Sequence, residues 1–349
     1  MLAPLSLADR LPVRHPPEAT ALSHHGGNLA AARLHFPDAP EPWIDLSTGI
    51  NPLAYPVEDL PAAIWRRLPD AAAQRQLEIV AGKSFDVPAS VEVVAAPGTQ
   101  SLIQILPRLL PARRVAILGF GYQEHPASWR AAGAEVVVVD DLRHLEEADV
   151  AVVVNPNNPD GRHVAPADLV ALSLRLAQRG GTLVVDEAFM DVHEPEASLL
   201  PYLPPEGAVV LRSFGKFFGL GGLRLGFAVA NPALAAAIRA QLGAWAVSGP
   251  AIAIGTRALG DRAWQAETRV ALHAAASRLD RCLAAAGFAV VGGTCLFRLT
   301  ARPDAAAWFG RLGRAGILVR PFAAEPTWLR FGLPADEAGW ARLDTVLRP

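Results

Sequence analysis

Short runs of β-branched residues alternate with alanine-rich stretches through the first two thirds of the chain. Nearly continuous runs of valine and isoleucine are typical of strands that are covered on both faces. Strands that alternate with helices predict a mostly parallel sheet within an α/β unit. The runs are VEVVAAPG from Val91, RVAILGFG from Arg114, EVVVVDD from Glu135, DVAVVVNPNNP from Asp149, TLVVDEAF from Thr182 and AVVLRSFGK from Ala208.

The pattern changes after Ala230. A long alanine-rich region from Pro232 to about Gly287 predicts helix, and a smaller α+β unit is expected to follow it. The first fifty residues are rich in proline, histidine and glycine, and they join neither pattern. In the smaller unit we expect strands Ala289 to Leu299, Ile317 to Pro321 and Trp328 to Gly332, and helices from Pro303 and Ala335.

These patterns predict three parts in the chain of 349 residues. We expect an N-terminal arm of residues 1–50, a large α/β domain of residues 51–235 and a small C-terminal α+β domain of residues 236–349. The length agrees with this division, because it corresponds to about two domains of ordinary size.

The composition favours a globular protein that acts on a small molecule. Hydrophobic residues make up 51% of the chain and charged residues 19%, so a large core is available. The formal net charge is −2 and the arginines are scattered, which argues against a nucleic-acid or anionic-membrane surface. We expect no disulfide and no metal, because Cys282 and Cys295 show no metal-ligand spacing with histidine. Without a basic leader or a bilayer-length apolar segment, we expect a cytoplasmic location.

Lysine is rare in this chain, and one lysine has an unusual context. Only Lys83 and Lys216 stand among 32 basic residues, and Lys216 lies in the glycine-rich, aromatic segment SFGKFFGLGGLRLGF. The pKa of lysine falls readily on burial, whereas arginine stays charged. A neutral amine can form an imine with an aldehyde, and pyridoxal phosphate is the commonest aldehyde held in this way. Lys216 is therefore the candidate anchor, whereas compositional bias alone is the simpler explanation for Lys83.

Polar or glycine-rich segments follow several predicted strands, where open α/β sheets bind their ligands. The turn PGTQS from Pro97 opens a helix whose free amides suit a phosphate, although many such turns are plain helix caps. NPNNPDG from Asn155 is either a tight connection or part of a site. Asp186 ends a buried strand, where a carboxylate is costly unless it meets a cation such as a protonated pyridine nitrogen.

Asp186 and Lys216 together predict chemistry at a pyridine ring. The carboxylate would keep the ring nitrogen protonated, so that the ring accepts the electron pair left at the substrate Cα, while the lysine holds the aldehyde and moves protons. Ser213 and Arg224 flank Lys216 in the sequence and could converge on a phosphate, to which arginine gives bidentate contact. The intervening glycines would let the backbone approach closely.

The motifs SFGKFFGLGGLRLGF, DEAF and NPNNP together carry a family resemblance. The chain resembles the fold type I pyridoxal-phosphate enzymes of the class I/II aminotransferase superfamily, in the branch of histidinol-phosphate aminotransferase. The resemblance extends over nearly the whole chain. It implies an aspartate-aminotransferase-like fold, pyridoxal 5'-phosphate as cofactor and a homodimer that shares its active sites.

The resemblance also implies roles for individual residues. Lys216 would hold the cofactor aldehyde as an imine, Asp186 would pair with the pyridine nitrogen, and Asn158 would bind the ring hydroxyl oxygen. In the segment GYQEHPASW, His125 fits the place of the ring-stacking group better than Tyr122. The residues expected to hold the cofactor phosphate are Gly98, Thr99, Ser213 and Arg224.

The segment from His25 to Pro56 narrows the resemblance. HGGN followed by INPL resembles the threonine-phosphate decarboxylases of cobalamin synthesis, and the histidinol-phosphate enzymes usually lack HGGN. In those decarboxylases the arm helps to cover the substrate, although an isolated HGGN is also an ordinary turn. The expected substrate-binding residues are His25, Gly26, Gly27, Asn28 and Asn51, with Arg330 for the α-carboxylate and Arg320 for the substrate phosphate.

The activity that this resemblance implies is a lyase reaction. L-Threonine O-3-phosphate would lose carbon dioxide to give (R)-1-aminopropan-2-ol O-phosphate, the linker used in cobalamin. An aminotransferase acting on histidinol phosphate or a related amino acid is the alternative. A non-catalytic or regulatory protein is a third, but no helix-turn-helix arm or basic patch is visible. Phe189 and Leu68 depart from the wider family pattern, because tyrosine commonly stands at both places.

Overall fold

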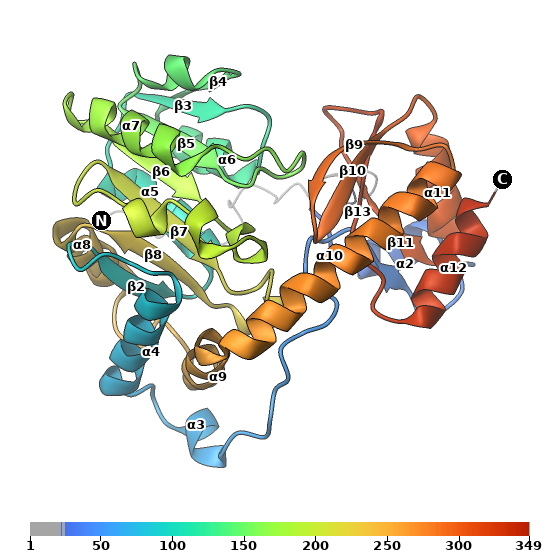
Figure 1. Ribbon diagram of the computed structural model, residues 1–349, viewed down its shortest axis with the longest axis horizontal. Coiled ribbons are helices and arrows are strands. Elements are labelled where there is room, and N and C mark those ends of the chain that lie inside the picture. The colour runs from blue at the N-terminus through green and yellow to red at the C-terminus, as the bar shows by residue number, and fades with distance from the viewer. Residues whose placement is uncertain (1–21, 23–24, 349) are drawn as a thin grey trace, which may run out of the picture.

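The computed structural model describes Leu22 and residues 25–348, and it has a larger and a smaller unit side by side (Figure 1). The long helix α10, Arg262–Ala285, runs from the larger unit to the smaller one. Apart from Leu22, the part of the predicted arm that precedes His25 lies outside the described residues. The part of the chain that is described contains no helix with the length and apolar character of a membrane span.

A seven-stranded sheet forms the larger unit and confirms the predicted α/β class. Its order is β2-β8-β7-β6-β5-β3-β4, and neighbouring strands are parallel except where β8 pairs with β2 and β7. Each of the six predicted valine and isoleucine runs supplies one strand, and β8 is a seventh that was not among them. The strands are β2 Glu92–Ala96, β3 Arg114–Leu118, β4 Glu135–Val139, β5 Val150–Val154, β6 Thr182–Asp186, β7 Ala208–Ser213 and β8 Gly226–Ala230.

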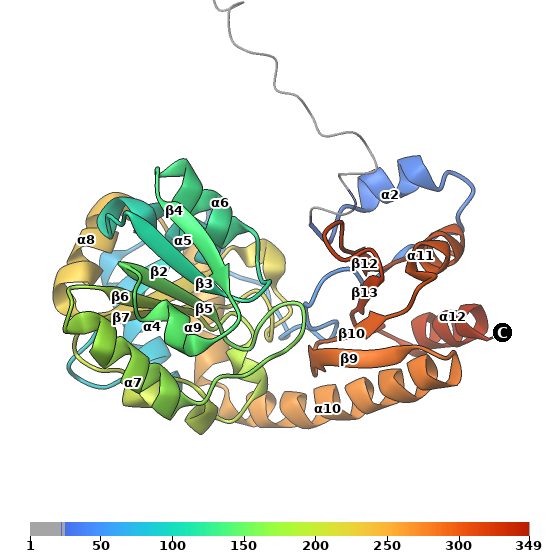
Figure 2. The same cartoon turned by 90° about the horizontal axis from the view of Figure 1, so that it is seen from above.

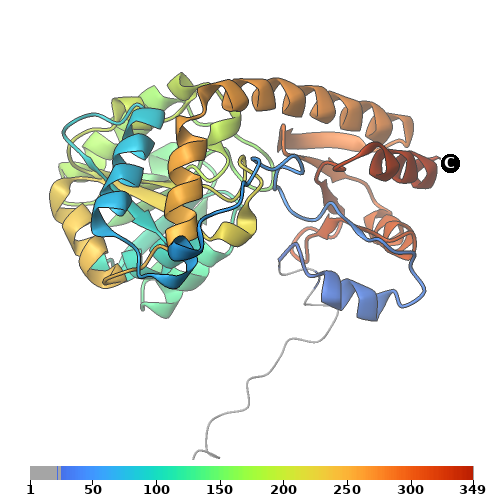
Figure 3. The ribbon, with the colours of Figure 1, turned by 90° about the horizontal axis from the view of Figure 1, so that it is seen from below.

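Helices cover both faces of this sheet. Successive residues of a strand point to opposite faces, so each strand contributes side chains to both helical layers. They are α4 Ala71–Ser84, α5 Thr99–Leu109, α6 Glu124–Ala131, α7 Pro166–Ala177, α8 Pro232–Leu242 and α9 Gly249–Gly260. Val152 faces a buried cluster that includes Ile103 of α5 and Ile238 of α8. Val153 faces the main cluster, which includes Leu77 of α4 and Leu172 of α7. Helices α4, in teal blue, and α9, in orange, lie side by side (Figure 3).

The smaller unit has a four-stranded antiparallel sheet in the order β12-β13-β10-β9. Its elements are β9 Ala289–Thr294, β10 Phe297–Ala301, α11 Ala305–Arg314, β11 Ile317–Leu318, β12 Arg320–Pro321, β13 Trp328–Phe331 and α12 Glu337–Leu347. The prediction of one strand from Ala289 to Leu299 is wrong, because the chain turns after Thr294 and makes a hairpin. The Thr294 side chain accepts a hydrogen bond from Leu296 N inside that turn, at 3.2 Å.

The amino-terminal arm packs against the smaller unit. Helix α2, Leu29–His35, lies beside α11 (Figure 2), and strand β1, Ile44–Asp45, pairs in parallel with β11. The Phe36 ring fills the space above Gly313 of α11, where an added Cβ would lie 2.2 Å from the ring. The arm therefore joins a sheet and a helical layer, which the sequence pattern did not predict.

The predicted helical region from Pro232 is divided into three helices. Gly243, with φ of 73°, ends α8, and α9 begins only at Gly249. The predicted boundary at residue 235 falls within α8, and both α8 and α9 pack on the larger unit. The division into domains stays a prediction, and this packing favours a boundary at α10. Short helices and turns complete the chain at α3 Ala62–Arg66, Leu142–Leu145, Met190–Val192, Pro195–Ala197, Leu200–Tyr202 and Gly221–Leu223.

A buried arginine ties β7 to the segment after β6. Arg212 Nη1 donates to Glu187 Oε2 at 3.1 Å, and Nη2 donates to Asp191 Oδ1. Glu187 also accepts from Ser198 Oγ at 2.6 Å. Burial raises the pKa of the Glu187 carboxyl, and Arg212 opposes that rise. Glu187 directly follows Asp186, the last residue of β6, and Arg212 directly precedes Ser213, the last residue of β7. The cluster therefore holds in place two strand ends of the predicted site.

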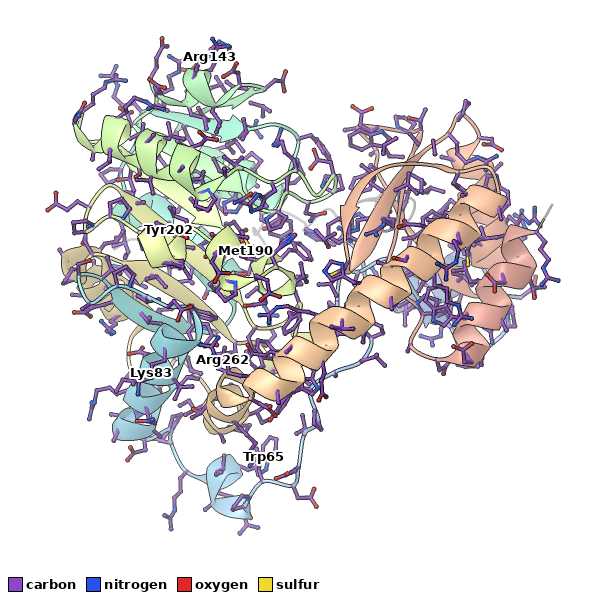
Figure 4. The ribbon with its side chains drawn as sticks, viewed as in Figure 1. Trp65, Lys83, Arg143, Met190, Tyr202 and Arg262 are labelled. Atoms are coloured by element: carbon purple, nitrogen blue, oxygen red, sulfur yellow. The ribbon has the colours of Figure 1, made fainter. Side chains whose placement is uncertain are left out.

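We expect Arg212→Met to destabilise the protein by about 3 to 5 kcal/mol, because it leaves buried carboxylates without their cation. Chemical denaturation would measure the loss. Arg143→Met is the matched control, since Arg143 forms its ion pair with Asp141 on the surface (Figure 4) and its loss should leave the unfolding midpoint unchanged. Equal midpoints for the two variants would contradict the structural importance of the buried cluster.

Candidate active site

The carboxyl edge of the parallel sheet gathers the predicted site residues. Asp186 ends β6 and Ser213 ends β7, while the segment with Asn158 follows β5. Gly98 follows β2, and Arg224 precedes β8. Because β8 runs antiparallel to β2 and β7, its first residues lie at the same edge as the last residues of those strands. Residues from distant parts of the chain therefore meet here.

A cavity of about 550 Å³ lies at this edge, between the two units. The arm supplies Thr48 and Gly49 to its wall, and the smaller unit supplies Phe322. Among the predicted residues, His25, Gly26, Asn158, Lys216, Arg320 and Arg330 line it. A larger cavity, of about 810 Å³, lies against the free edge of β2 and is lined by none of the predicted site residues.

The Lys216 amine is buried in this cavity. Burial, with a smaller effect of the Arg330 charge, lowers the pKa of Lys216 to about 8, and Asp186 opposes that shift. Nζ lies 5.5 Å from the centroid of the Phe189 ring, which forms part of an apolar wall. An amine with this pKa is available in both protonation states near neutral pH, so it can act as a nucleophile and as a proton carrier.

Asp186 is held at its strand end by two hydrogen bonds. His125 Nε2 lies 2.9 Å from Asp186 Oδ2, and Oδ1 accepts from Ala188 N at 3.0 Å. His125 is buried in the first turn of α6, so its ring is turned to the carboxylate. Tyr122, which precedes α6, lines the cavity instead. The geometry thus contradicts the preference for His125 over Tyr122 as the ring-stacking group.

Gly98, Thr99 and Arg224 lie close together at this edge of the sheet. Gly98 has φ of 81°, and an added Cβ would lie 2.7 Å from Arg224 Nη2. Thr99 opens α5, whose first amides are free to bind an anion. Arg224 is left-handed at φ 54°, and its Nη1 donates to Gly221 O at 3.0 Å. With Ser213 at the neighbouring strand end, these groups suit a phosphate.

Arg330 links both units and the arm. Its Nη1 donates to Asn158 Oδ1, and its Nη2 donates to Ser47 O at 2.7 Å. Burial lowers the pKa of Arg330 to about 9, with the Arg320 charge as a second cause. Arg320 also lines the cavity, and burial lowers its pKa to about 10. Two guanidinium groups thus face the space in front of Lys216.

Three residues predicted to bind substrate have local structural roles. Asn28 caps α2, where its side chain accepts from Ala31 N at 3.0 Å, and Gly27 N donates to Ser47 Oγ at 2.7 Å. The buried Asn51 side chain donates to Phe217 O at 2.8 Å and accepts from Leu53 N at 2.9 Å. None of these three lines the cavity, and the structure shows local structural roles for them, so their assignment to the substrate stays a prediction.

Other cavity residues were missed by the sequence reasoning. Thr48 and Gly49 lie in the arm, and an added Cβ at Gly49 would be 2.8 Å from the Phe189 ring. Phe120 and Arg130 come from the segments around α6. No motif marks these positions. The position of Gly121 and Tyr122 directly after strand β3 is the one signal that could have indicated this part of the wall.

Comparison with known proteins agrees with this geometry. The family model of aminotransferase class I and II matches residues 44–339, and the chain belongs to this family, whose enzymes use pyridoxal phosphate. It is 44% identical to a threonine-phosphate decarboxylase of Pseudomonas aeruginosa over 326 residues, which cover 93% of this chain and 96% of that protein. It is 45% identical to a threonine-phosphate decarboxylase of Sinorhizobium sp. over 329 residues, covering 93% and 97% of the two chains.

A solved structure supports the fold. The histidinol-phosphate aminotransferase of Sinorhizobium meliloti, in complex with pyridoxal-5'-phosphate, superposes with a TM-score of 0.80 at 19% identity, covering 97% of each chain. This likeness confirms the predicted aspartate-aminotransferase-like fold.

The lowered pKa of Lys216 predicts a pH dependence of cofactor capture. We expect the rate at which the apoprotein reacts with pyridoxal phosphate to rise with pH and to level off above pH 8, because only the neutral amine attacks an aldehyde. Stopped-flow absorbance would follow it. Lys216→Arg keeps the charge without a neutral amine and should show no such reaction. A rate that still rises toward the ordinary lysine value of 10.5 would contradict the shift.

Proposed function

We propose that this protein catalyses the decarboxylation of L-threonine O-3-phosphate with pyridoxal 5'-phosphate as cofactor. The observation that carries the proposal is the lining of the cavity. Lys216, Arg130, Arg320 and Arg330 lie on its wall, and no carboxylate does among the described residues. A substrate with an α-carboxylate and a phosphate matches this charge. The similarity to two threonine-phosphate decarboxylases over 93% of the chain supports the same substrate.

The residues at the sheet edge fit the proposed cofactor. Lys216 would hold its aldehyde carbon, and the Asp186 carboxylate, oriented by His125, would face the pyridine nitrogen. The Asn158 side chain would bind the ring hydroxyl oxygen while its Oδ1 keeps its bond to Arg330. Tyr122 would cover the ring, because it lines the cavity three residues before His125, in the segment that leads into α6. The phosphate would be held by Gly98, Thr99, Ser213 and Arg224.

The chemistry divides between cofactor and chain. The bound cofactor would accept the electron pair that remains at Cα when the bond to the carboxylate breaks and carbon dioxide leaves. Arg330 would bind the carboxylate and hold that bond perpendicular to the ring, since this orientation is what selects the bond to be broken. Lys216 Nζ, with a pKa of about 8, would then deliver a proton to Cα. Arg320 at the cavity wall would bind the substrate phosphate, and His25 would lie over the substrate while it keeps its contact with Glu124.

The direct test is to incubate the cofactor-loaded protein with L-threonine O-phosphate in the absence of any 2-oxo acid. We expect many turnovers per site, with aminopropanol phosphate and carbon dioxide identified by mass. Lys216→Ala should lower the rate by at least about a thousandfold, because it removes both the amine and the proton carrier. Consumption of one substrate per site, with no carbon dioxide, would support the aminotransferase alternative instead.

We further propose that the protein forms a homodimer through the surface around α3 and α4. Trp65 of α3 (Figure 4) is 66% exposed, and Leu68 is 67% exposed. Leu68 lines a cavity of about 450 Å³ between α3, α4 and α9, and Ile64 of α3 lines it too. Exposed apolar side chains clustered beside a groove are typical of an interface. The cytoplasmic location and the place in cobalamin synthesis stay predictions.

We expect Trp65→Glu combined with Leu68→Glu to halve the mass measured by sedimentation, since buried charge would oppose association. Val270→Glu is the control, because Val270 is 71% exposed on α10, away from this groove. A wild-type protein that sediments as a monomer would contradict the proposed dimer.

A further inference from the structure

The arm contributes His25 and Gly26 to the cavity wall, and it is attached at both ends of residues 25–27. At one end, Gly27 N donates to Ser47 Oγ at 2.7 Å, and the Ser47 carbonyl accepts from Arg330. An added Cβ at Gly26 would lie 2.3 Å from Ser47 O, so this backbone approach requires glycine. At the other end, His25 Nε2 lies 3.1 Å from Glu124 Oε1 on the larger unit. His25 and Gly26 line the cavity between these two attachments.

The Glu124 carboxylate is itself held in place by two polar residues. Gln100 Nε2 donates to Glu124 Oε2 at 2.7 Å, and Gln100 Oε1 accepts from the Tyr122 hydroxyl at 3.0 Å. Burial raises the pKa of Tyr122 to about 12, so its hydroxyl stays protonated and donates. The donors and acceptors run in one direction from Tyr122 through Gln100 to Glu124. The network therefore joins the start of α5, the start of α6 and the arm.

Glu124 does not itself line the cavity, and its side chain is 20% exposed. A carboxylate inside the cavity would repel an anionic substrate, whereas at this position its hydrogen bonds go to His25 of the arm and Gln100 of α5. The alternative role for a carboxylate at the start of α6 is to stabilise that helix through the helix dipole. Attachment of the arm predicts that loss of Glu124 speeds amide exchange in the arm, whereas stabilisation of α6 alone does not predict this.

We infer that Glu124 is a positioning residue that fastens the arm over the bound substrate through His25, while Gln100 and Tyr122 orient its carboxylate. The arm then spans from Ser47, which contacts Arg330, to the larger unit. Substrate enters when the His25–Glu124 contact opens, and its closure excludes water from Lys216. The effect on catalysis rests on the proposed decarboxylation, whereas the effect on the arm does not.

The experiment combines hydrogen exchange with kinetics on the cofactor-loaded protein. In Glu124→Ala we expect amide exchange in residues 26–28 to rise several-fold, while peptides from α5 and α6 keep their protection. The KM for L-threonine O-phosphate should rise roughly two- to fivefold with little change in kcat, as expected for a partly exposed ion pair. Glu267→Ala, on the exposed side of α10, is the matched control and should change neither quantity.

The His25→Ala variant is the second part of the test, since it removes the hydrogen-bond partner of Glu124 without changing α6. If Glu124 acts through His25, the double variant should show no larger KM than the His25→Ala variant alone. Additive effects, unchanged arm exchange in Glu124→Ala, or exchange that rises across α6 as well would overturn the inference. If the wild-type protein does not decarboxylate L-threonine O-phosphate, the proposed function fails, but the exchange measurement still decides the role of Glu124.

Discussion

Burial of the Lys216 amine is the constraint on which the arrangement of this molecule depends. An amine in water is protonated and does not react, and the exclusion of water is the main cause of the lowered pKa of Lys216. The larger unit supplies the lysine and the Phe189 ring, the arm supplies Gly49 pressed against that ring, and the smaller unit supplies Arg330. All three parts of the chain contribute to the exclusion of water from the amine. The two units and the arm must therefore be in contact for the amine to have its lowered pKa.

The wall of the cavity also carries several positively charged side chains. Arg320 and Arg330 are both held where burial lowers their pKa, which means that the fold bears an electrostatic cost there. Asp186 is the one carboxylate that acts on Lys216 from the strand ends, and it is bonded to His125 behind the cavity. An anionic ligand would relieve this cost, so the charge that disfavours the empty site favours binding.

Much of the fold and the centre of the site could be predicted because both depend on short-range rules. Valine-rich runs marked the strands, and strand ends in a parallel sheet placed Asp186, Asn158 and Ser213 together. The hairpin after Ala289 was missed because its turn, at Cys295 and Leu296, carries no glycine or proline. Asn28 and Asn51 were assigned to substrate although asparagine is equally suited to helix caps and local turns.

The remaining errors concern contacts that no local pattern specifies. The choice between Tyr122 and His125 depended on where α6 begins, and one residue of difference in a helix start rotates the side chain by about 100°. Glu124 and Ser47 gave no signal at all, since their partners, His25 and Arg330, lie far away in the sequence. Long-range pairs of this kind become visible only when the units are assembled.

The pairing of β1 with β11 has a consequence for synthesis. Ile44 leaves the ribosome early, but Ile317, its partner, is among the last residues made. The larger unit can acquire its sheet while translation continues, because its strands follow one another closely, whereas the smaller unit has to wait for both ends of the chain. Until then the arm must remain unpaired beside an already folded sheet. The last step of folding is therefore also the step that closes the cavity, so a chain cut short near its carboxyl end would present an open, hydrated lysine.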